Sequence, residues 1–320
     1  MHELNKQTST ILAIGECMLE LIPDTEDSLK MSFAGDVYNA LVYGKRCFPD
    51  TNCAFFTGTG NDAISQKMVQ RWQREGINTE FVQYSDQHSL GIYSISVDEA
   101  GERSFSYWRK DSAATKLMEF LTLEQYSDLL TNVDLVFFSG ISLGILSIEN
   151  RDKLLALVAK MRAQGKVIAF DPNYRPSMYE SDQDASEWMT KAYQVSDIAL
   201  PGLDEHQDIF NHTHVKQVAA FCLEHGVKEV VIKAGDAGTY VYEQENPPVH
   251  VPFTPAPKQI DSTAAGDSFA GAYLVSRLNN LSINNALLNA NIVAGEVVQH
   301  QGGILTQTTF NQTLSNKIIK

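Results

Sequence analysis

The chain of 320 residues is acidic, with 39 Asp and Glu against 25 Lys and Arg and a formal net charge of −14. This charge disfavours nucleic acid and anionic membranes as partners, because their phosphates repel an acidic surface. With 43% apolar residues, the chain has enough hydrophobic material to bury one large core or two smaller ones.

Four cysteines show no C-x-x-C pair and no metal-ligand spacing with histidine: Cys17, Cys47, Cys53 and Cys222. This usage is typical of buried thiols in a reducing compartment. The apolar run before Glu16 is too short for a signal peptide. No uncharged apolar run approaches the ~20 residues that a membrane span requires. We therefore expect a soluble, cytoplasmic protein.

Short apolar runs alternate with helical patterns along most of the chain. Strands are predicted over 11–15, 53–57, 135–139, 167–170, 198–200 and 229–233. Helices are predicted over 38–47, 63–75, 123–130, 149–163, 186–194 and 216–225, and again from 269 to 278. Strands that are apolar along their whole length predict a mainly parallel sheet with helices on both faces. Ligands of such sheets bind at the carboxyl ends of the strands.

Two regions, 16–33 and 89–108, instead alternate apolar and polar residues, which is typical of half-buried strands. The turn Asp98-Glu99-Ala100-Gly101 makes the second region a predicted hairpin. Together they predict a small sheet laid over the α/β core. Five prolines between 245 and 259 indicate a rigid connector and not a linker between domains.

The stretch DSTAAGDSFAGAYL, from Asp261 to Leu274, places small residues directly before a helical pattern. Glycine and alanine leave the first N–H groups of such a helix uncovered, and together with the helix dipole these groups favour a bound anion such as phosphate. Asp267 lies in the first turn, and amide donors beside a fixed carboxylate suit phosphoryl transfer to a hydroxyl. The alternative is that Asp267 or Ser268 only caps the helix.

Polar residues that could contact a polyol follow the first alternating region. Gly35 allows a close approach of the main chain, while Asp36 and Asn39 supply acceptors and donors for hydroxyl groups. The alternative is that Asp36 is the N-cap of the next helix.

In the predicted hairpin, Tyr93, Tyr107 and Arg109 alternate with other residues, so Tyr107 and Arg109 share one face. Turned inward, they would offer a phenol and a guanidinium to a carboxylate. The alternative is an exposed, solvated hairpin.

Two loops that follow predicted strands are candidate ligand contacts, the second of them for phosphates or adenine. In the first, Pro172 and Pro176 restrain the chain and direct Arg175 across the sheet edge, although a turn with a surface arginine has the same pattern. In the second, 233–238, two glycines permit a tight turn that exposes its backbone. The sequence contains no G-x-x-x-x-G-K-[ST], which excludes a Walker-type phosphate loop.

Two further patterns suggest other enzyme classes. The segment 58–63 fits G-x-G-x-x-A, and Glu80 lies near the acidic position of a dinucleotide-binding unit, which favours a dehydrogenase. The segment 140–144 fits the G-x-S-x-G of a hydrolase, with Asp residues and His300 later in the chain. No helical pattern begins directly after Ser142, as a nucleophile elbow would need.

DSTAAGDSFAGAYL resembles the C-terminal signature of the PfkB (ribokinase-like) carbohydrate kinases, and residues 34–40, AGDVYNA, resemble their N-terminal signature. The resemblance covers nearly the whole chain. The segments GECMLELIP, FAGDVYNALVYGKR, GERSFSYWR, FFSGISLGILS and DPNYRP are similar to those of members that phosphorylate 2-keto-3-deoxygluconate.

The resemblance implies one ribokinase-like α/β domain over 1–320, with a discontinuous β lid from about 16–34 and 88–111 over the sugar site. It implies ATP, Mg²⁺ and a monovalent cation such as K⁺ as ligands, and a homo-oligomer formed through the lid. The implied reaction phosphorylates 2-keto-3-deoxygluconate at its 6-hydroxyl. A ribokinase or fructokinase is the alternative within the family, and an NAD-dependent dehydrogenase is a remoter one.

Roles of individual residues also follow from the resemblance. The base would be Asp267, with an anion hole at Ala264, Ala265 and Gly266. The sugar would contact Gly35, Asp36, Asn39, Tyr93, Tyr107, Arg109 and Arg175, the two arginines recognising its carboxylate. The nucleotide would contact Asn173, Arg175, Lys233, Gly235, Asp236, Gly238 and Gly266.

The chain departs from the family pattern at two positions. Gly202 stands where the motif N-x-x-E has Asn, so only Glu205 remains to order the waters of Mg²⁺. Ala264 stands where Gly is commoner, and we expect it to be tolerated because N–H groups do the binding. The helix dipole favours the charged form of Asp267, which predicts a weak base.

Overall fold

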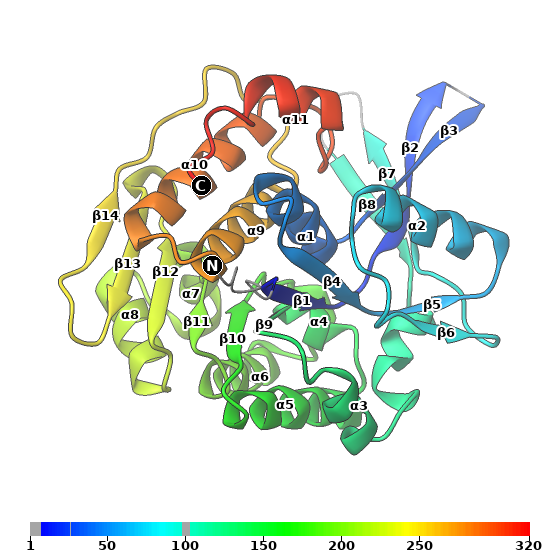
Figure 1. The fold of residues 1–320 in the computed structure, drawn as a ribbon, viewed down its shortest axis with the longest axis horizontal. Coiled ribbons are helices and arrows are strands. Elements are labelled where there is room, and N and C mark those ends of the chain that lie inside the picture. The colour runs from blue at the N-terminus through cyan, green and yellow to red at the C-terminus, as the bar shows by residue number, and fades with distance from the viewer. Residues whose placement is uncertain (1–7, 26, 98–102) are drawn as a thin grey trace, which may run out of the picture.

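The computed structural model describes residues 8–25, 27–97 and 103–320, and its centre is a mainly parallel eight-stranded sheet (Figure 1). All six predicted strands are present to within two residues. The parallel strands run in the order β12 (Glu229–Lys233), β11 (Ile198–Ala199), β10 (Val167–Asp171), β9 (Leu135–Ser139), β1 (Thr10–Ile14) and β4 (Asn52–Phe56). At the β12 edge, β13 (Thr239–Glu243) and β14 (Val249–Val251) add antiparallel strands. The predicted α/β class is confirmed.

Helices cover both faces of the sheet, and each face has its own apolar core (Figure 1). The strands are buried on both sides, so their continuous apolar runs have partners in both cores. On one face lie α1 (Asp36–Cys47), α9 (Ala265–Leu278), α10 (Ile283–Val297) and α11 (Gln307–Thr313), with α2 (Ala63–Arg74) packed at the β4 edge. On the other lie α3 (Leu123–Leu129), α5 (Ile148–Ala163), α6 (Asp182–Gln194) and α8 (Val215–Glu224).

Helices α1 and α9 cross at very close range. A Cβ atom on Gly271 of α9 would lie 2.0 Å from the carbonyl oxygen of Ala40 in α1, so only glycine allows this contact. The close crossing places the first turn of α9 beside the first turn of α1. Two signatures more than two hundred residues apart in the sequence therefore meet at one end of the sheet.

The two alternating regions form a separate four-stranded sheet in the order β3-β2-β7-β8, which projects from the body in Figure 1. Its strands are β2 (Met18–Thr25), β3 (Ser28–Ala34), β7 (Ile92–Val97) and β8 (Arg103–Trp108). β7 and β8 pair in antiparallel fashion, while the turn predicted between them lies outside the described residues. A two-stranded sheet joins β5 (Gly58–Gly60) to β6 (Gln83–Ser85). We refer to the four-stranded sheet as the lid.

Within the described ranges, four α-helices are not predicted by the sequence: α4 (Gly140–Gly144), α7 (Leu203–Phe210), α10 and α11. In α10, several asparagines lower the intrinsic helix propensity. The buried Asn289 donates to Ser276 Oγ at 3.0 Å and to the carbonyl of Ile319 at 2.9 Å, so tertiary partners stabilise this helix. The start of α6 was also missed, since Ser181 caps the helix and its first residue, Asp182, lies four residues before the predicted range.

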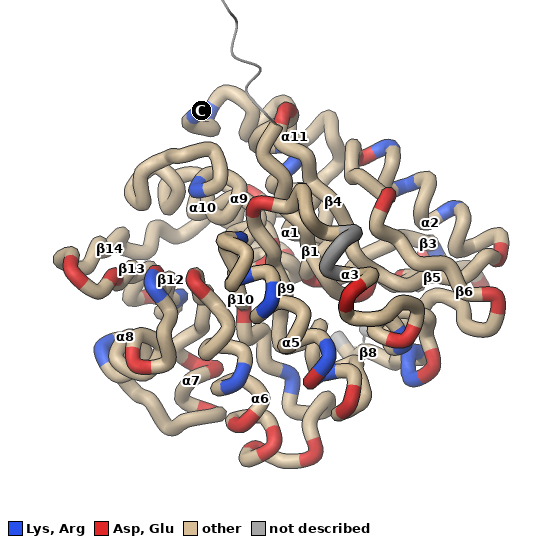
Figure 2. The backbone as a smooth tube through the Cα atoms, turned by 60° about the horizontal axis from the view of Figure 1, so that its bottom comes forward, with Lys and Arg blue, Asp and Glu red and all other residues tan. Residues whose placement is uncertain are grey.

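Acidic and basic positions are interspersed along the chain (Figure 2). Within the described ranges, no helix combines the length and the apolar character that crossing a membrane would demand.

Candidate active site

A cleft of about 1040 Å³ opens at the carboxyl ends of the parallel strands, between the α/β body and the lid. Its walls come from the β3–α1 junction, strands β7 and β8, the loop after β10, α7, the turn after β12 and the start of α9. Most of the residues singled out by the sequence line this one cleft. The structure thus brings together side chains from both halves of the chain.

The first turn of α9 presents backbone amides to the cleft. Ala264, the N-cap residue, is left-handed with φ 60°, and the first bond within the helix runs from Ser268 N–H to its carbonyl at 2.9 Å. The N–H groups of Gly266 and Asp267 come before this bond, as donors of an open helix end do. The Ala265 amide donates to the Ser262 carbonyl at 3.2 Å instead.

The loop before α9 is fixed by the buried Asp261. Its carboxylate accepts hydrogen bonds from Thr263 N–H at 3.0 Å and Gly302 N–H at 2.8 Å. The first bond lies within the loop, and the second ties the loop to the segment after α10. The amides of the first turn are therefore preorganised, which is what electrostatic stabilisation of a moving charge requires.

Asp267 is half-buried at the cleft floor, and Asn39 Nδ2 donates to its Oδ2 at 2.9 Å. Burial, followed by the negative charges of Asp36 and Asp171, raises the pKa of Asp267 to about 7, against the lowering effects of Asn39 and Arg175. The prediction of a weak base kept charged by the helix dipole is therefore wrong. Its neighbours outweigh the dipole, so Asp267 titrates near neutrality and is a competent proton acceptor.

Asp36 links three segments of the cleft. Its Oδ2 accepts hydrogen bonds from Ser139 Oγ at 2.6 Å and from Asn173 Nδ2 at 3.1 Å. The capping alternative is wrong, because Gly35 is the N-cap of α1 and its missing Cβ would lie 2.1 Å from the carbonyl of Glu16. Sequence reasoning missed Ser139, although the position at the end of a predicted strand could have indicated it.

Lys233 lines the cleft and forms an ion pair with a buried carboxylate. Its Nζ lies 3.0 and 2.9 Å from the two carboxylate oxygens of Asp171, a residue that is 5% exposed. Burial raises the pKa of Asp171 to about 6. Burial opposes the charge of Lys233, but Asp171 and Glu205 outweigh it and raise the pKa of Lys233. Both partners are thus ionised at neutral pH, and Lys233 is a fixed cation. Sequence reasoning gave Asp171 no role.

One part of the 233–238 turn lines the cleft, and the other part shapes the turn. Lys233 and Gly235 line the cleft, whereas Asp236 and Gly238 are not among its walls. Gly238 has φ 87°, and a Cβ there would lie 2.2 Å from the carbonyl of Val251. Its glycine is therefore required by the turn itself.

The Glu205 carboxylate accepts two backbone hydrogen bonds at the edge of the cleft. Tyr174 N–H donates to Oε1 at 2.9 Å and Gly202 N–H donates to Oε2 at 2.7 Å. These bonds hold the charged carboxylate in place across the loops after β10 and β11. No group of three or more His, Cys, Asp or Glu side chains with metal-site geometry occurs within the described ranges.

The lid faces the cleft with stacked aromatic rings. Tyr93 and Tyr107 have ring centroids 5.8 Å apart, and Phe105 stacks on Tyr107 at 6.3 Å. All three line the cleft, so this face of the hairpin is not simply solvated, although Tyr107 remains 53% exposed. The Tyr93 hydroxyl donates to Glu20 at 2.5 Å, so its oxygen is left as an acceptor.

The two predicted arginines differ in their partners. Arg109 Nε donates to Glu16 at 2.7 Å, and its Nη2 lies 2.5 Å from the same oxygen, with Ser112 Oγ on the other oxygen. Glu16 is 2% exposed, and sequence reasoning assigned it no function. Arg175 is exposed at the cleft and donates from Nη1 to the Tyr174 carbonyl at 2.8 Å. Asn173, two residues before Arg175, has a positive φ of 36°.

The two patterns that suggested other enzyme classes have structural roles. Asp62 caps α2, accepting from the amides of Ile64 and Ser65, as an ordinary helix N-terminus does. Ser142 is 2% exposed and its Oγ donates to the carbonyl of Ile14 at 2.6 Å, so it is not a nucleophile. The helix α4 (Gly140–Gly144) begins before Ser142 and ends two residues after it, so no helix begins directly after Ser142, as expected.

Comparison with known proteins agrees with this geometry. Residues 8–309 match the model of the pfkB family carbohydrate kinases. The chain belongs to this family. Similar curated proteins include the 2-dehydro-3-deoxygluconokinase of Dickeya dadantii, 36% identical over 93% of this chain and 97% of that protein. A protein of the same name from Escherichia coli K12 is 36% identical over 92% of this chain and 96% of its own length.

Solved structures of other sugar kinases share the fold. The 2-dehydro-3-deoxygluconokinase of Thermotoga maritima has a TM-score of 0.78 at 17% identity, over 96% of this chain and 98% of that one. The aminoimidazole riboside kinase of Salmonella enterica has a TM-score of 0.79 at 20% identity, over 96% and 99% of the two chains. The chain is therefore a carbohydrate kinase with a ribokinase-like fold.

Proposed function

We propose that this kinase transfers the γ-phosphoryl group of ATP to the 6-hydroxyl of 2-keto-3-deoxygluconate, forming the 6-phosphate. The observation that carries the proposal is the geometry of the half-buried Asp267, which lines the cleft beside the open amides of α9 and is held by Asn39 at 2.9 Å. The choice of sugar is supported by relatives named 2-dehydro-3-deoxygluconokinase that are similar over nearly the whole chain. The choice of ATP is supported by a related aminoimidazole riboside kinase solved with an ATP analogue.

In this mechanism Asp267 accepts the proton of the 6-hydroxyl as its oxygen attacks the γ-phosphorus. The bond from that phosphorus to the ADP oxygen breaks, and the electron pair leaves with ADP. The N–H groups of Gly266 and Asp267, with Ala264 shaping the turn and Ala265 closing it, stabilise the charge on the migrating phosphoryl oxygens. Asn39 keeps the Asp267 carboxylate aimed at the cleft through their 2.9 Å hydrogen bond.

The sugar acid would lie between α1 and the lid. Gly35, Asp36 and Asn39 would bind its hydroxyls, and the rings of Tyr93 and Tyr107 would cover it. Its carboxylate would meet Arg175 and the Nη1 side of Arg109, because Glu16 already binds Nε and Nη2 of that guanidinium. A guanidinium held by a buried acid keeps its fork in one orientation, which favours a planar carboxylate over a neutral hydroxyl.

The nucleotide would lie along the turn after β12 and the loop after β10. Lys233, fixed by Asp171, and the exposed Arg175 are cations placed to contact its phosphates, with Asn173 and Gly266 beside them. Gly235 leaves the main chain open at the cleft wall, while Asp236 and Gly238 would shape the turn.

The donor set at the cleft fits Mg²⁺. This ion keeps several waters and usually takes one or two carboxylates plus substrate phosphates, so it does not require a cage of protein ligands. Glu205, fixed by two backbone amides, would hold those waters, and the ion would neutralise charge on the phosphates. A structure described as a ribokinase II from E. coli was solved with ATP and Mg²⁺, which supports the same pair of ligands here.

A monovalent cation and a dimer formed through the lid complete the proposal. The cation rests on the family resemblance, and turnover in KCl compared with tetramethylammonium chloride at equal ionic strength tests it.

The dimer is supported by apolar lid side chains that remain exposed, among them Leu29 at 55%, Met31 at 52% and Trp108 at 61%. Light scattering of the wild type and of Met31→Glu tests the dimer, and an unchanged monomeric mass in both would contradict it.

A coupled assay of ADP release over a panel of acceptors tests the main proposal. We expect turnover with 2-keto-3-deoxygluconate to exceed that with fructose, ribose and gluconate, and NMR of the product to show phosphorus on C6. Equal or faster turnover with fructose or ribose would replace the proposal by a kinase for neutral sugars.

A further inference from the structure

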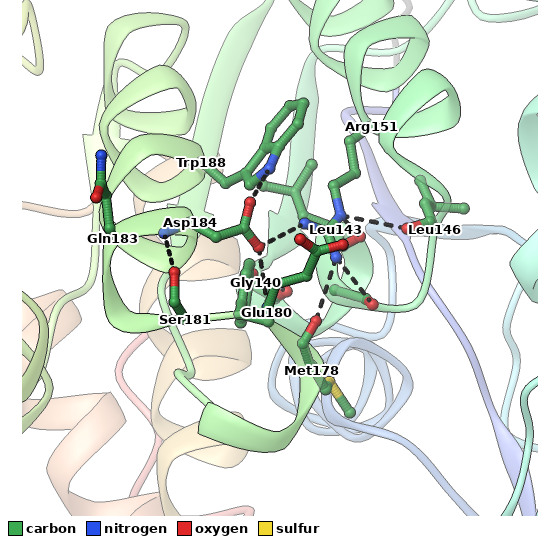
Figure 3. Close-up of polar contacts among 12 residues, drawn as sticks. Gly140, Leu143, Leu146, Arg151, Met178, Glu180, Ser181, Gln183, Asp184 and Trp188 are labelled. Carbon is green, nitrogen blue, oxygen red and sulfur yellow. Dashed lines mark hydrogen bonds and ion pairs between the residues drawn. The ribbon is translucent and has the colours of Figure 1, made fainter.

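Arg151 of α5 extends toward the end of α4 and toward Met178 and Asp184 (Figure 3). Met178 is one of the residues that line the cleft. Arg151 is only 7% exposed, and a charged side chain is retained in such a place only when its donors are satisfied. It contacts Leu143 O at 3.0 Å, Leu146 O at 3.2 Å, Gly144 O at 3.4 Å, Met178 O at 3.2 Å and Asp184 Oδ2 at 3.5 Å.

These acceptors come from three separate segments. Leu143 and Gly144 belong to the last turn of α4, and Leu146 lies two residues beyond its end. The carbonyl of Leu143 also accepts a hydrogen bond from Leu146 N–H at 3.0 Å, so Arg151 adds a second donor to it. Met178 belongs to the short 3-10 turn η2 (Pro176–Met178), and Asp184 belongs to α6. Arg151 therefore joins the end of α4 to the loop that follows β10.

Aromatic rings enclose the same guanidinium. Its Cζ lies 5.0 Å from the ring centroid of Tyr179 and 5.4 Å from that of Trp188. The Tyr179 hydroxyl continues across to α4, donating to the carbonyl of Gly140 at 2.7 Å. The planar fork of arginine can stack and donate in several directions at once, which lysine cannot do.

The loop after β10 lies directly on α4. A Cβ on Gly140 would lie 1.9 Å from the Pro172 carbonyl, and a Cβ on Gly144 would lie 2.8 Å from Met178 Cβ. On the cleft side of this contact, the carboxylate of Asp36 accepts hydrogen bonds from both Asn173 and Ser139. Ser139 is the N-cap of α4. The contacts between α4 and the loop after β10 therefore also set the distance between Ser139 and Asn173 at the cleft.

We propose that Arg151 is a positioning residue that sets the Asn173–Arg175 segment against Ser139 and Asp36 and so tunes substrate affinity. This rests on the proposed function, in which that segment contacts both substrates. Asp267 is placed by α9 and held by Asn39 of α1, and neither helix contributes an acceptor to Arg151. Loosening the wall should therefore raise KM for the sugar acid and for ATP while leaving kcat nearly unchanged.

Arg162 provides a matched control on the same helix. It also donates to two carbonyls, Gln194 O and Gly226 O, both at 2.9 Å, and its Nε lies 3.1 Å from Asp197. These partners lie at the opposite end of the sheet from the cleft. If Arg151 only stabilised the fold, its substitution, like that of Arg162, would leave KM unchanged below the unfolding transition.

The test compares Arg151→Lys with Arg162→Lys in thermal unfolding and in steady-state kinetics below both transitions. We expect both to lower Tm, and only Arg151→Lys to raise the two KM values by about tenfold, short of the ~10² that a 1 Å misplacement can cost. Tyr179→Phe, which removes one hydroxyl, should raise them in the same direction by a smaller factor. KM values unchanged in both cleft-side variants, or raised equally by Arg162→Lys, would overturn the inference.

Asn173→Ala separates this inference from the proposed function. If Asn173→Ala leaves both KM values unchanged, the assigned role of the segment fails, and the inference fails with it. If Asn173→Ala raises KM but Arg151→Lys and Tyr179→Phe do not, only the positioning role is wrong.

Discussion

The floor and the walls of the cleft surround their charged side chains with opposite kinds of partner. At the floor, Asp267 has a neutral amide as its nearest partner, and burial, followed by the charges of two other carboxylates, raises its pKa to about 7. On the walls, Arg109 and Lys233 each meet a buried acid, Glu16 and Asp171. Burial and like charges thus favour a carboxylate that exchanges a proton near neutral pH at the floor, while opposite charges hold fixed cations on the walls.

The largest effect should come from removing the reactive carboxylate. Asp267→Asn should lower kcat by at least ~10²–10⁴, because the attacking hydroxyl loses its proton acceptor. Binding of the sugar acid, measured by calorimetry, should persist, since the amide keeps the shape of the site. Asp62→Asn, the same change at the start of α2 and away from the cleft, is the control and should retain kcat. A kcat near wild type in Asp267→Asn would remove the base assignment.

On the wall, Arg109→Ala should raise KM for the sugar acid about tenfold or more and destabilise the fold by about 3–5 kcal/mol. The second effect arises because Glu16 is left buried without its counter-ion. The double variant Glu16→Gln/Arg109→Met should recover most of the stability but none of the affinity. Denaturant unfolding and kinetics together test this, and recovery of KM in the double variant would show that Arg109 does not contact the substrate.

The pH profile of kcat/KM should sharpen the contrast between floor and wall. The carboxylate form of Asp267 is the active one, so the rate should fall as pH decreases through about 7. Asp36→Asn removes a charge that raises this pKa, so the acid limb should move to lower pH. Asn39→Ala removes a hydrogen bond that lowers it, so the limb should move to higher pH. Shifts of the same sign in both variants would contradict this account.

The smallest effect concerns the turn itself. Ala264 has φ 60°, where an L-residue is strained by roughly 1–2 kcal/mol and glycine is not. Ala264→Gly should change the free energy of unfolding by less than about 1 kcal/mol, in the stabilising direction, and retain kcat. Ala265→Gly, one residue later inside the helix, should instead destabilise by about 1 kcal/mol. Denaturant midpoints compare the two variants, and destabilisation by Ala264→Gly would show that the strain is relieved elsewhere.

Local pattern was sufficient for much of the fold. The six strands, most helices and the two lid regions follow from runs of apolar residues whose period is a property of the backbone. The helices α7, α10 and α11 were not foreseeable in this way, because contacts such as those of Asn289 offset their weak propensities.

In the candidate site, too, local patterns predicted some residues and only tertiary contacts revealed others. Asp267, Asp36 and Lys233 were predicted because each lies beside a strand end or a helix start, which sequence spacing reveals. Ser139, Asp171 and Glu16 were missed as partners, since nothing local distinguishes a buried acid or hydroxyl that is paired across the cleft. The direction of the Asp267 pKa shift was missed for the same reason.

From its residues alone, this chain determines an acidic α/β protein with an anion-binding helix start and the signatures of a sugar kinase. Backbone geometry and helix dipoles act over a few residues, so a linear pattern is enough to specify them. Which charges meet was decided only by the tertiary structure, through the close crossing of α1 and α9 at Gly271 and the packing of the lid. Electrostatic energies depend on distance and burial in three dimensions, and neither quantity is contained in sequence spacing.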